Sequence, residues 1–129
     1  MVARMPVRPG LSSSVDLLVS DADTAIALRS GEVPVLATPR LIALLEEAAV
    51  AAVAGQLEHG QTSVGVRVQF EHISPTPVGA AVRGEASLER VEGRRLTFNV
   101  AARDERGLVA AGKVTRVVVD TDRFLERAR

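Results

Sequence analysis

The sequence contains no cysteine, tryptophan or tyrosine, and three phenylalanines are its only aromatic residues. The absence of cysteine excludes a disulfide framework, thiolate catalysis and cysteine-ligated zinc. So few aromatic side chains argue against a surface on which nucleic-acid bases stack. Lys113 is the only lysine, so the 16 basic residues are nearly all arginine, and they balance 16 acidic residues. A net charge of zero gives no support for binding to nucleic acid or to an anionic membrane.

Long hydrophobic runs are also missing. The longest unbroken apolar run, residues 48–54, is far shorter than the roughly 20 residues that a membrane span needs. Residues 1–10 are basic, but no apolar segment of a secretion signal follows them. We therefore expect a cytoplasmic protein that does not bind membranes. Its 129 residues suit a single domain with its own core, and residues 1–11, which contain Pro6, Pro9 and Gly10, are expected to form a loose N-terminal arm.

The most apolar segment, TPRLIALLEEAAVAAVAG at residues 38–55, has the pattern of a helix. Thr38 is a suitable N-cap, Pro39 suits the first turn, and Gly55 or Gly60 ends the element. A helix that is apolar on all sides is normally buried. Glu46 and Glu47 interrupt this apolar surface, and a carboxylate in such a setting costs several kcal/mol unless it is paired.

The remaining segments read mainly as strands. Residues 12–20 predict a first strand, and residues 21–31 a short helix capped by Asp21 or Asp23. In residues 62–74 the period changes to two, which places Val64, Val66, Val68, Phe70 and His72 on an inward face and Gly65 on the other. Three more strands are predicted at 80–91, 95–104 and 108–120, with a turn at Gly93 and a terminal helix at 121–129 capped by Thr121. We expect the four strands after the long helix to form consecutive hairpins.

This order of elements predicts an α+β fold of the hot-dog type. A single helix that is apolar all round needs a sheet wrapped around it, or a second subunit to close the remainder. In a hot-dog fold, a curved antiparallel five-stranded sheet wraps one long central helix, and such folds usually pair as dimers through a sheet edge.

Four segments resemble the hot-dog thioesterase family that includes fluoroacetyl-CoA thioesterase: LATPRLIALLEEAA, GVRVQFEHISPTPVG, VEGRRLTFNVAARD and GKVTRVVVD. The resemblance spans about residues 12–127. It places Thr38, Glu46 and His72 at the family's catalytic threonine, glutamate and histidine. It places Gly65 at the glycine near the thioester carbonyl and Arg116 at the late-strand arginine, both as substrate-binding positions.

The resemblance implies an acyl-CoA thioesterase that releases free acid and CoA from a small acyl-CoA. No metal or other cofactor is expected beyond the coenzyme A of the substrate. The fluoroacetyl-specific member carries aromatic side chains as a lid over its acyl pocket, whereas this chain has no aromatic residue before Phe70 and reads RSGEVPV at residues 29–35. A general acyl-CoA thioesterase is therefore expected.

Each candidate residue also has a purely structural interpretation. A desolvated Glu46 can act as base or nucleophile, but either it or Glu47 can instead be solvated at the helix edge or paired with an arginine. An inward His72 can carry a proton to the leaving thiolate, or be a core histidine bonded to backbone carbonyls. Thr38 can be only a cap, Gly65 can mark a bulge or a close helix–sheet approach, and Arg116 needs a carboxylate or a ligand phosphate as partner.

Helix geometry adds a constraint on the oligomer. Thr38 and Glu46 are eight residues apart, or roughly 12 Å along a regular helix, so they cannot touch within one chain. The sequence therefore predicts a homodimer, or a higher oligomer, whose active site takes residues from two subunits. A non-catalytic acyl-CoA binding module is the alternative, since fold does not dictate activity. A hot-dog dehydratase is disfavoured because its Asp/His motif is absent. The acyl chain, the carrier and the nucleophile-or-base role of the glutamate stay open.

Overall fold

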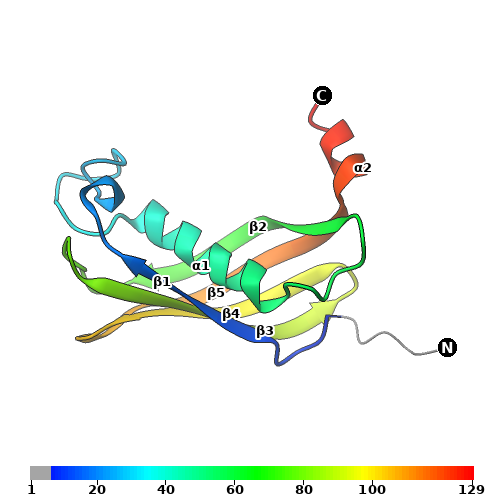
Figure 1. Ribbon diagram of the computed structural model, residues 1–129, viewed down its shortest axis with the longest axis horizontal. Coiled ribbons are helices and arrows are strands. Elements are labelled where there is room, and N and C mark those ends of the chain that lie inside the picture. Colours follow the sequence, from blue (N-terminus) through cyan, green and yellow to red (C-terminus); the bar gives the residue numbers. More distant parts are fainter. Residues whose placement is uncertain (1–6) are drawn as a thin grey trace.

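The computed structural model describes residues 7–129, which form five strands, one long helix and two short helical segments (Figure 1). The elements are β1 (Ser12–Leu18), the 3-10 helix η1 (Asp21–Asp23), α1 (Thr38–Ala52), β2 (Gln61–His72), β3 (Ala81–Glu92), β4 (Arg95–Asp104), β5 (Gly107–Asp120) and α2 (Thr121–Glu126). The predicted α+β order is confirmed. Most of the expected N-terminal arm lies outside the described residues, while the Gly10 N–H donates to the carbonyl of Leu88. None of the described helices is long and apolar enough to cross a membrane.

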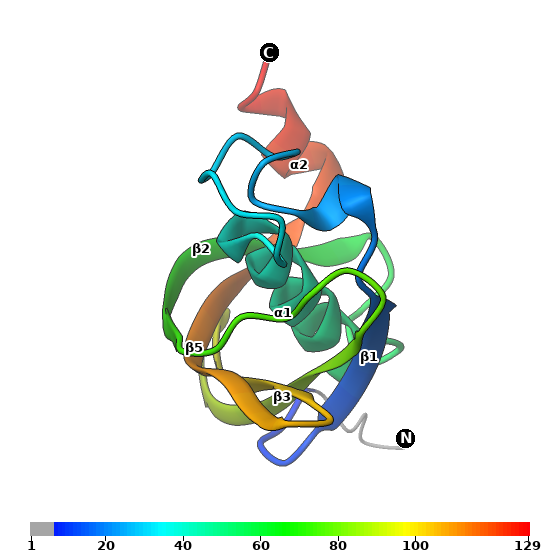
Figure 2. The ribbon, with the colours of Figure 1, turned by 90° about the vertical axis from the view of Figure 1, so that its left-hand side faces the viewer.

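The five strands form one antiparallel sheet in the order β1-β3-β4-β5-β2. Viewed end-on, this sheet curls around α1, which is the expected hot-dog arrangement (Figure 2). The prediction of four consecutive hairpins is wrong for β2, which pairs with β5 rather than β3. The connection at residues 73–80 contains two prolines and is too long for a tight turn, so it crosses the start of α1 instead. It is fixed there by the bridge from Val35 to Pro77 and the hydrogen bond from Leu36 N–H to the Thr76 carbonyl.

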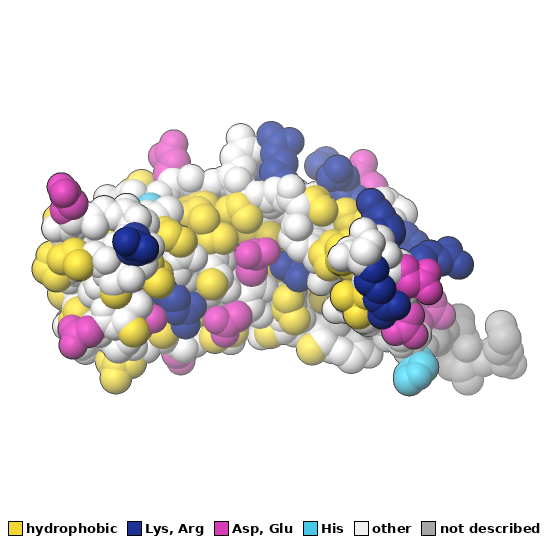
Figure 3. Space-filling model, turned by 90° about the horizontal axis from the view of Figure 1, so that it is seen from above, with side chains coloured by type: hydrophobic (Ala, Val, Ile, Leu, Met, Phe, Trp, Pro, Cys, Tyr) yellow, Lys and Arg dark blue, Asp and Glu magenta, His cyan; other side chains and the backbone are white. Residues whose placement is uncertain are grey.

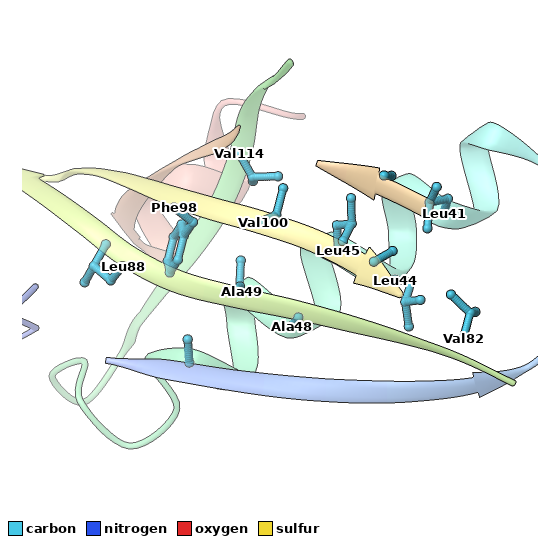
Figure 4. Packing of buried hydrophobic residues seen from close by; sticks show 14 of the residues in the cluster. Leu41, Leu44, Leu45, Ala48, Ala49, Val82, Leu88, Phe98, Val100 and Val114 are labelled. Carbon is cyan, nitrogen blue, oxygen red and sulfur yellow. The ribbon is translucent and has the colours of Figure 1, made fainter. Parts of the chain in front are cut away.

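The core lies between α1 and the concave face of the sheet (Figure 4). It includes Leu41, Leu44, Leu45, Ala48 and Ala49 of α1 and Val82, Leu88, Phe98, Val100 and Val114 of the sheet. The helix packs mainly against β1 and β3 and only lightly against β2 and β5. Ala43, Glu47 and Val50 of α1 are therefore exposed, so the chain does not bury this helix all round.

A bulge in β2 changes which of its residues face the helix. Gly65 pairs with Arg116 and Arg67 with Thr115, which leaves Val66 as the extra residue, 51% exposed. An inserted residue reverses the alternation of side chains along a strand. Gly65 therefore faces α1, and a Cβ placed there would collide with the Glu46 carboxylate. The prediction that Val64 and Val66 share an inward face with Val68, and that Gly65 lies opposite, is wrong.

The three predicted helix N-caps lie one or more positions earlier in the chain than expected. The N-cap of α1 is Ala37, whose carbonyl accepts the first helical hydrogen bond from Leu41, so Thr38 is the first helical residue and its hydroxyl does not cap. The N-cap of η1 is Ser20, which forms a capping box with Asp23. The N-cap of α2 is Asp120 in place of Thr121. Gly93 has the expected positive φ, at 62°.

Candidate functional site

Thr38 and His72 form the first cluster of candidate residues. The Thr38 hydroxyl and His72 Nδ1 are 2.8 Å apart, a hydrogen bond that joins the start of α1 to the end of β2. Thr38 is available for this bond because Ala37 occupies the capping position. His72 Nε2 is buried and has no hydrogen-bond partner among the described residues. Burial lowers the pKa of His72 below its usual value, and the backbone of Ser74 opposes this shift only in part.

Glu46 and Arg116 form the second cluster. Arg116 Nη1 donates to Glu46 Oε2 at 3.0 Å, while Nε donates to the Ser63 hydroxyl and Nη2 to the Ser63 carbonyl, each at 2.8 Å. The arginine side chain is only 9% exposed, against 33% for the glutamate. Burial lowers the pKa of Arg116, and the charge and hydrogen bond of Glu46 partly offset this effect. The partner that the sequence required for Arg116 is thus a carboxylate of the same chain.

Gly65 lies beside this pair on the inner face of β2. A Cβ placed on Gly65 would clash with the Glu46 carboxylate and would lie 3.4 Å from Arg116 Nη1. The glycine therefore allows the carboxylate to lie directly over the strand backbone. Both structural interpretations of Gly65, the bulge and the close helix–sheet approach, are found together.

The two neighbouring glutamates have different surroundings. Glu47 is more exposed, at 54% of its side chain, and its Oε1 lies 3.5 Å from Arg40 Nη1. Arg40 also donates to Asp23, at 3.1 Å, and so links the start of α1 to η1. Glu47 therefore has the ordinary ion pair of a surface residue, and Glu46 is the carboxylate that lies over β2.

The two clusters stay apart within the chain. Across residues 7–129, Glu46 makes no hydrogen bond or ion pair with Thr38 or His72. This agrees with the separation expected from eight residues of helix. No three His, Asp or Glu side chains in the described part of the chain are grouped so that they could hold a metal ion.

A shallow, mainly apolar depression lies above Glu46. It is lined by Val15, Ala43, Glu46, Glu47, Val50, Ala51, Ser63, Val64, Gly65 and Arg116. Seen from above, hydrophobic side chains form a strip along the middle of this face, with charged groups set among them (Figure 3). The depression adjoins β2, which is an edge strand of the sheet.

Comparison with known proteins identifies the family. Residues 19–122 match the model of a family described as fluoroacetyl-CoA-specific thioesterase. The chain belongs to this family. The fluoroacetyl-CoA thioesterase of Streptantibioticus cattleyicolor is 37% identical over 95 residues, which cover 74% of this chain and 68% of that protein. Membership of the fluoroacetyl-CoA thioesterase family confirms the resemblance found in the sequence and makes the chain a thioester hydrolase.

Solved structures of the family have the same fold. The fluoroacetyl-CoA thioesterase FlK gives a TM-score of 0.90 at 32% identity, covering 95% of this chain and 96% of that chain. A variant of FlK in complex with fluoroacetate and CoA gives 0.85 at 32% identity, covering 92% of this chain and 99% of that one. The hot-dog architecture is therefore shared over nearly the whole chain.

Ser63 is the residue of this site that the sequence did not indicate. It is 8% exposed and accepts two hydrogen bonds from Arg116. A signal did exist, because an arginine on the inward face between Val114 and Val118 needs several acceptors. Finding them requires the pairing of β2 with β5 and the bulge, which place Ser63 and Gly65 on the same inner face.

Proposed function

We propose that this protein hydrolyses small acyl-CoA thioesters to free acid and CoA, with Thr38, Glu46 and His72 as its catalytic residues. Membership of a thioesterase family supports the reaction, and the complex of an FlK variant with fluoroacetate and CoA supports an acyl-CoA substrate. The observation that carries the assignment is Glu46, a partly buried carboxylate held by Arg116 directly over the bare backbone of Gly65. A carboxylate fixed in this way is suited to attack, or to activate water toward, a carbonyl carbon above it.

The proposed reaction begins at the thioester carbonyl. Gly65 has no side chain, so the thioester can lie against β2 beside Glu46 with its carbonyl oxygen near the strand backbone. As a nucleophile, Glu46 would form an acyl-glutamyl intermediate and expel the CoA thiolate, and water would then release the acid. As a general base, it would take a proton from the attacking water directly. In both routes the hydroxyl of water ends on the acyl carbon and a proton ends on the CoA sulfur.

His72 is proposed to supply that proton. Its Nδ1 is engaged by the Thr38 hydroxyl, and its Nε2 is the free ring nitrogen. With Nδ1–H donating to the Thr38 hydroxyl oxygen, Nε2 is free to take the proton that the attacking water loses and to pass it to the CoA sulfur. Thr38 then fixes the tautomer and orientation of the ring, and the free N–H groups at the start of α1 add a site for the thioester oxygen. The reaction needs no metal or cofactor, so removal of metals with EDTA is expected to leave the rate unchanged.

The active site is proposed to lie between two subunits of a homodimer. The exposed Ala43, Glu47 and Val50 of α1 and the free edge of β2 offer a self-complementary surface. If two copies of α1 run antiparallel across a twofold axis, the Thr38–His72 pair of one subunit approaches Glu46 of the other. This arrangement removes the roughly 12 Å separation that one helix imposes.

The acyl group is proposed to be a general short acyl chain. The segment at residues 29–35 lacks aromatic side chains, and Val33 within it is 53% exposed. Such a segment offers no rigid aromatic wall that could select one small acyl group over slightly longer ones.

A thiol-release assay on acetyl-, butyryl- and hexanoyl-CoA tests this function. We expect hydrolysis by the wild type, a fall of about 100-fold or more for Glu46→Gln, and less than about threefold change for the matched control Glu47→Gln. Equal rates for the wild type and Glu46→Gln would refute the role of Glu46. Calorimetric binding of acyl-CoA without any thiol release would instead make the protein a binding module. The same assay with an acyl-carrier-protein thioester identifies the carrier.

A further inference from the structure

Ser63 holds the Arg116 guanidinium at two points. Its hydroxyl oxygen accepts from Nε and its carbonyl oxygen from Nη2, each at 2.8 Å, and both bonds are buried. Two bonds from one residue fix both the position and the plane of a guanidinium group. The arrangement depends on the strand register, since Gly65 pairs with Arg116 and Ser63 lies two residues before it on the same face.

These two hydrogen bonds determine how Arg116 pairs with Glu46. Arginine–carboxylate pairs are frequently bidentate, with two parallel N–H···O bonds. Here only Nη1 reaches Glu46, at 3.0 Å from Oε2, because Nε and Nη2 are turned toward Ser63. Among the described residues, the second oxygen of Glu46 accepts no hydrogen bond.

We propose that Ser63 is a positioning residue for thioester hydrolysis. By engaging two donors of Arg116, it limits the Arg116–Glu46 ion pair to one hydrogen bond. The second carboxylate oxygen of Glu46 is then free to react. This inference rests on the catalytic role proposed for Glu46. It explains why a buried arginine can lie beside a reactive carboxylate without engaging both of its oxygens.

Replacement of Ser63 by alanine has a defined consequence. Nε of Arg116 loses its acceptor in a buried place, which is unfavourable. The guanidinium can restore its hydrogen bonds by turning toward Glu46 and forming a bidentate pair. Both carboxylate oxygens are then engaged and the charged form of the carboxylate is more strongly held, so the group becomes a weaker base and nucleophile. Ser63→Thr keeps the hydroxyl, so Arg116 is expected to keep its single hydrogen bond to Glu46.

The test measures kcat and KM as functions of pH for the full-length wild type, Ser63→Ala and Ser63→Thr. For Ser63→Ala we expect kcat to fall about tenfold, KM to change less than about twofold, and the acidic limb of kcat/KM to move to lower pH. Ser63→Thr should restore most of the rate and the original pH profile. Ser63→Cys, whose thiol is a weaker hydrogen-bond acceptor, should shift the acidic limb of kcat/KM in the same direction by a smaller amount. This variant replaces Ser63→Ala in the test if Ser63→Ala does not fold.

A double-mutant cycle separates this role from a general structural one. In a Glu46→Gln background, Ser63→Ala should have no further effect on the residual rate, because no charged carboxylate is left to position. An equal loss in both backgrounds, or an unchanged kcat and pH profile for Ser63→Ala in the wild type, would overturn the inference alone. A fully active Glu46→Gln would overturn the proposed function, and this inference with it.

Discussion

At the scale of single residues, His72 carries the one buried side-chain nitrogen or oxygen in the described part of the chain that has no hydrogen-bond partner. One ring nitrogen bonds to Thr38, and the other is buried without a partner. A buried polar atom in this condition costs about 1–3 kcal/mol, and such atoms call for an explanation such as catalysis or ligand binding. A substrate or water that meets Nε2 would remove this cost, so the orphaned nitrogen agrees with its proposed role as proton donor to the thiolate.

The lowered pKa of His72 gives a prediction for stability. The unfolded chain takes up the histidine proton near pH 6.5, and the folded chain only at lower pH. Below about pH 6.5 the unfolded state therefore binds more protons, so the free energy of unfolding falls with acidification until the pH passes the folded pKa. We expect His72→Gln to lose less stability than the wild type between about pH 7.5 and pH 5, measured by urea unfolding. An equal loss for the two proteins would contradict the buried, neutral histidine.

The candidate residues were predictable to different degrees. Thr38, Glu46 and His72 were chosen from the sequence because the resemblance places them at the family's catalytic positions, and because Glu46 and His72 also interrupt apolar patterns. Their grouping into two clusters, and the choice of Glu46 over Glu47 as the carboxylate above β2, depend on distances that only the fold gives. Ser63 was missed because a serine in a strand has many ordinary explanations.

At the scale of elements, β2 controls the site through its bulge and its glycine. The bulge turns Ser63 and Gly65 toward α1, and Gly65 leaves space for the Glu46 carboxylate. Gly84 of β3 also faces α1, but its Cβ would lie 2.8 Å from Cγ of the core residue Leu44. The two glycines therefore offer a comparison between a site position and a packing position on the same face of one sheet.

Alanine substitution at these glycines should separate activity from stability. In Gly65→Ala the new methyl group displaces a movable carboxylate, so we expect kcat/KM to fall at least tenfold and stability to change by less than about 1 kcal/mol. In Gly84→Ala the methyl group overpacks the core, so we expect a loss of about 1–3 kcal/mol in the free energy of unfolding. Thiol release and urea unfolding measure both properties. A fully active Gly65→Ala would show that the close approach of Glu46 to β2 is not needed.

The elements themselves were largely predictable, since β4 has the predicted range and the other strands differ by one or two residues at their ends. The bulge was not, because Val64, Val66 and Val68 alternate without a visible break. The pairing of β2 with β5 was also missed, since periodicity tells which residues form a strand but not which strand lies beside it.

At the scale of the whole molecule, the central feature is a helix covered on one side only. The sheet covers the side of α1 that carries Leu41, Leu44 and Leu45, while Ala43 and Val50 remain exposed beside the edge strand β2. The same surface contains Glu46. A partner subunit placed there would both cover the apolar strip and bring a second Thr38–His72 pair to the carboxylate.

The most direct test of this account is activity complementation between two inactive variants. His72→Gln and Glu46→Gln subunits are unfolded, mixed in equal amounts and refolded, and native mass spectrometry verifies that mixed dimers form. Half of the dimers should then be mixed, each with one intact site, so the mixture should regain about a quarter of the wild-type thiol-release rate. A mixture that contains mixed dimers but is no more active than its two parents would contradict the shared active site.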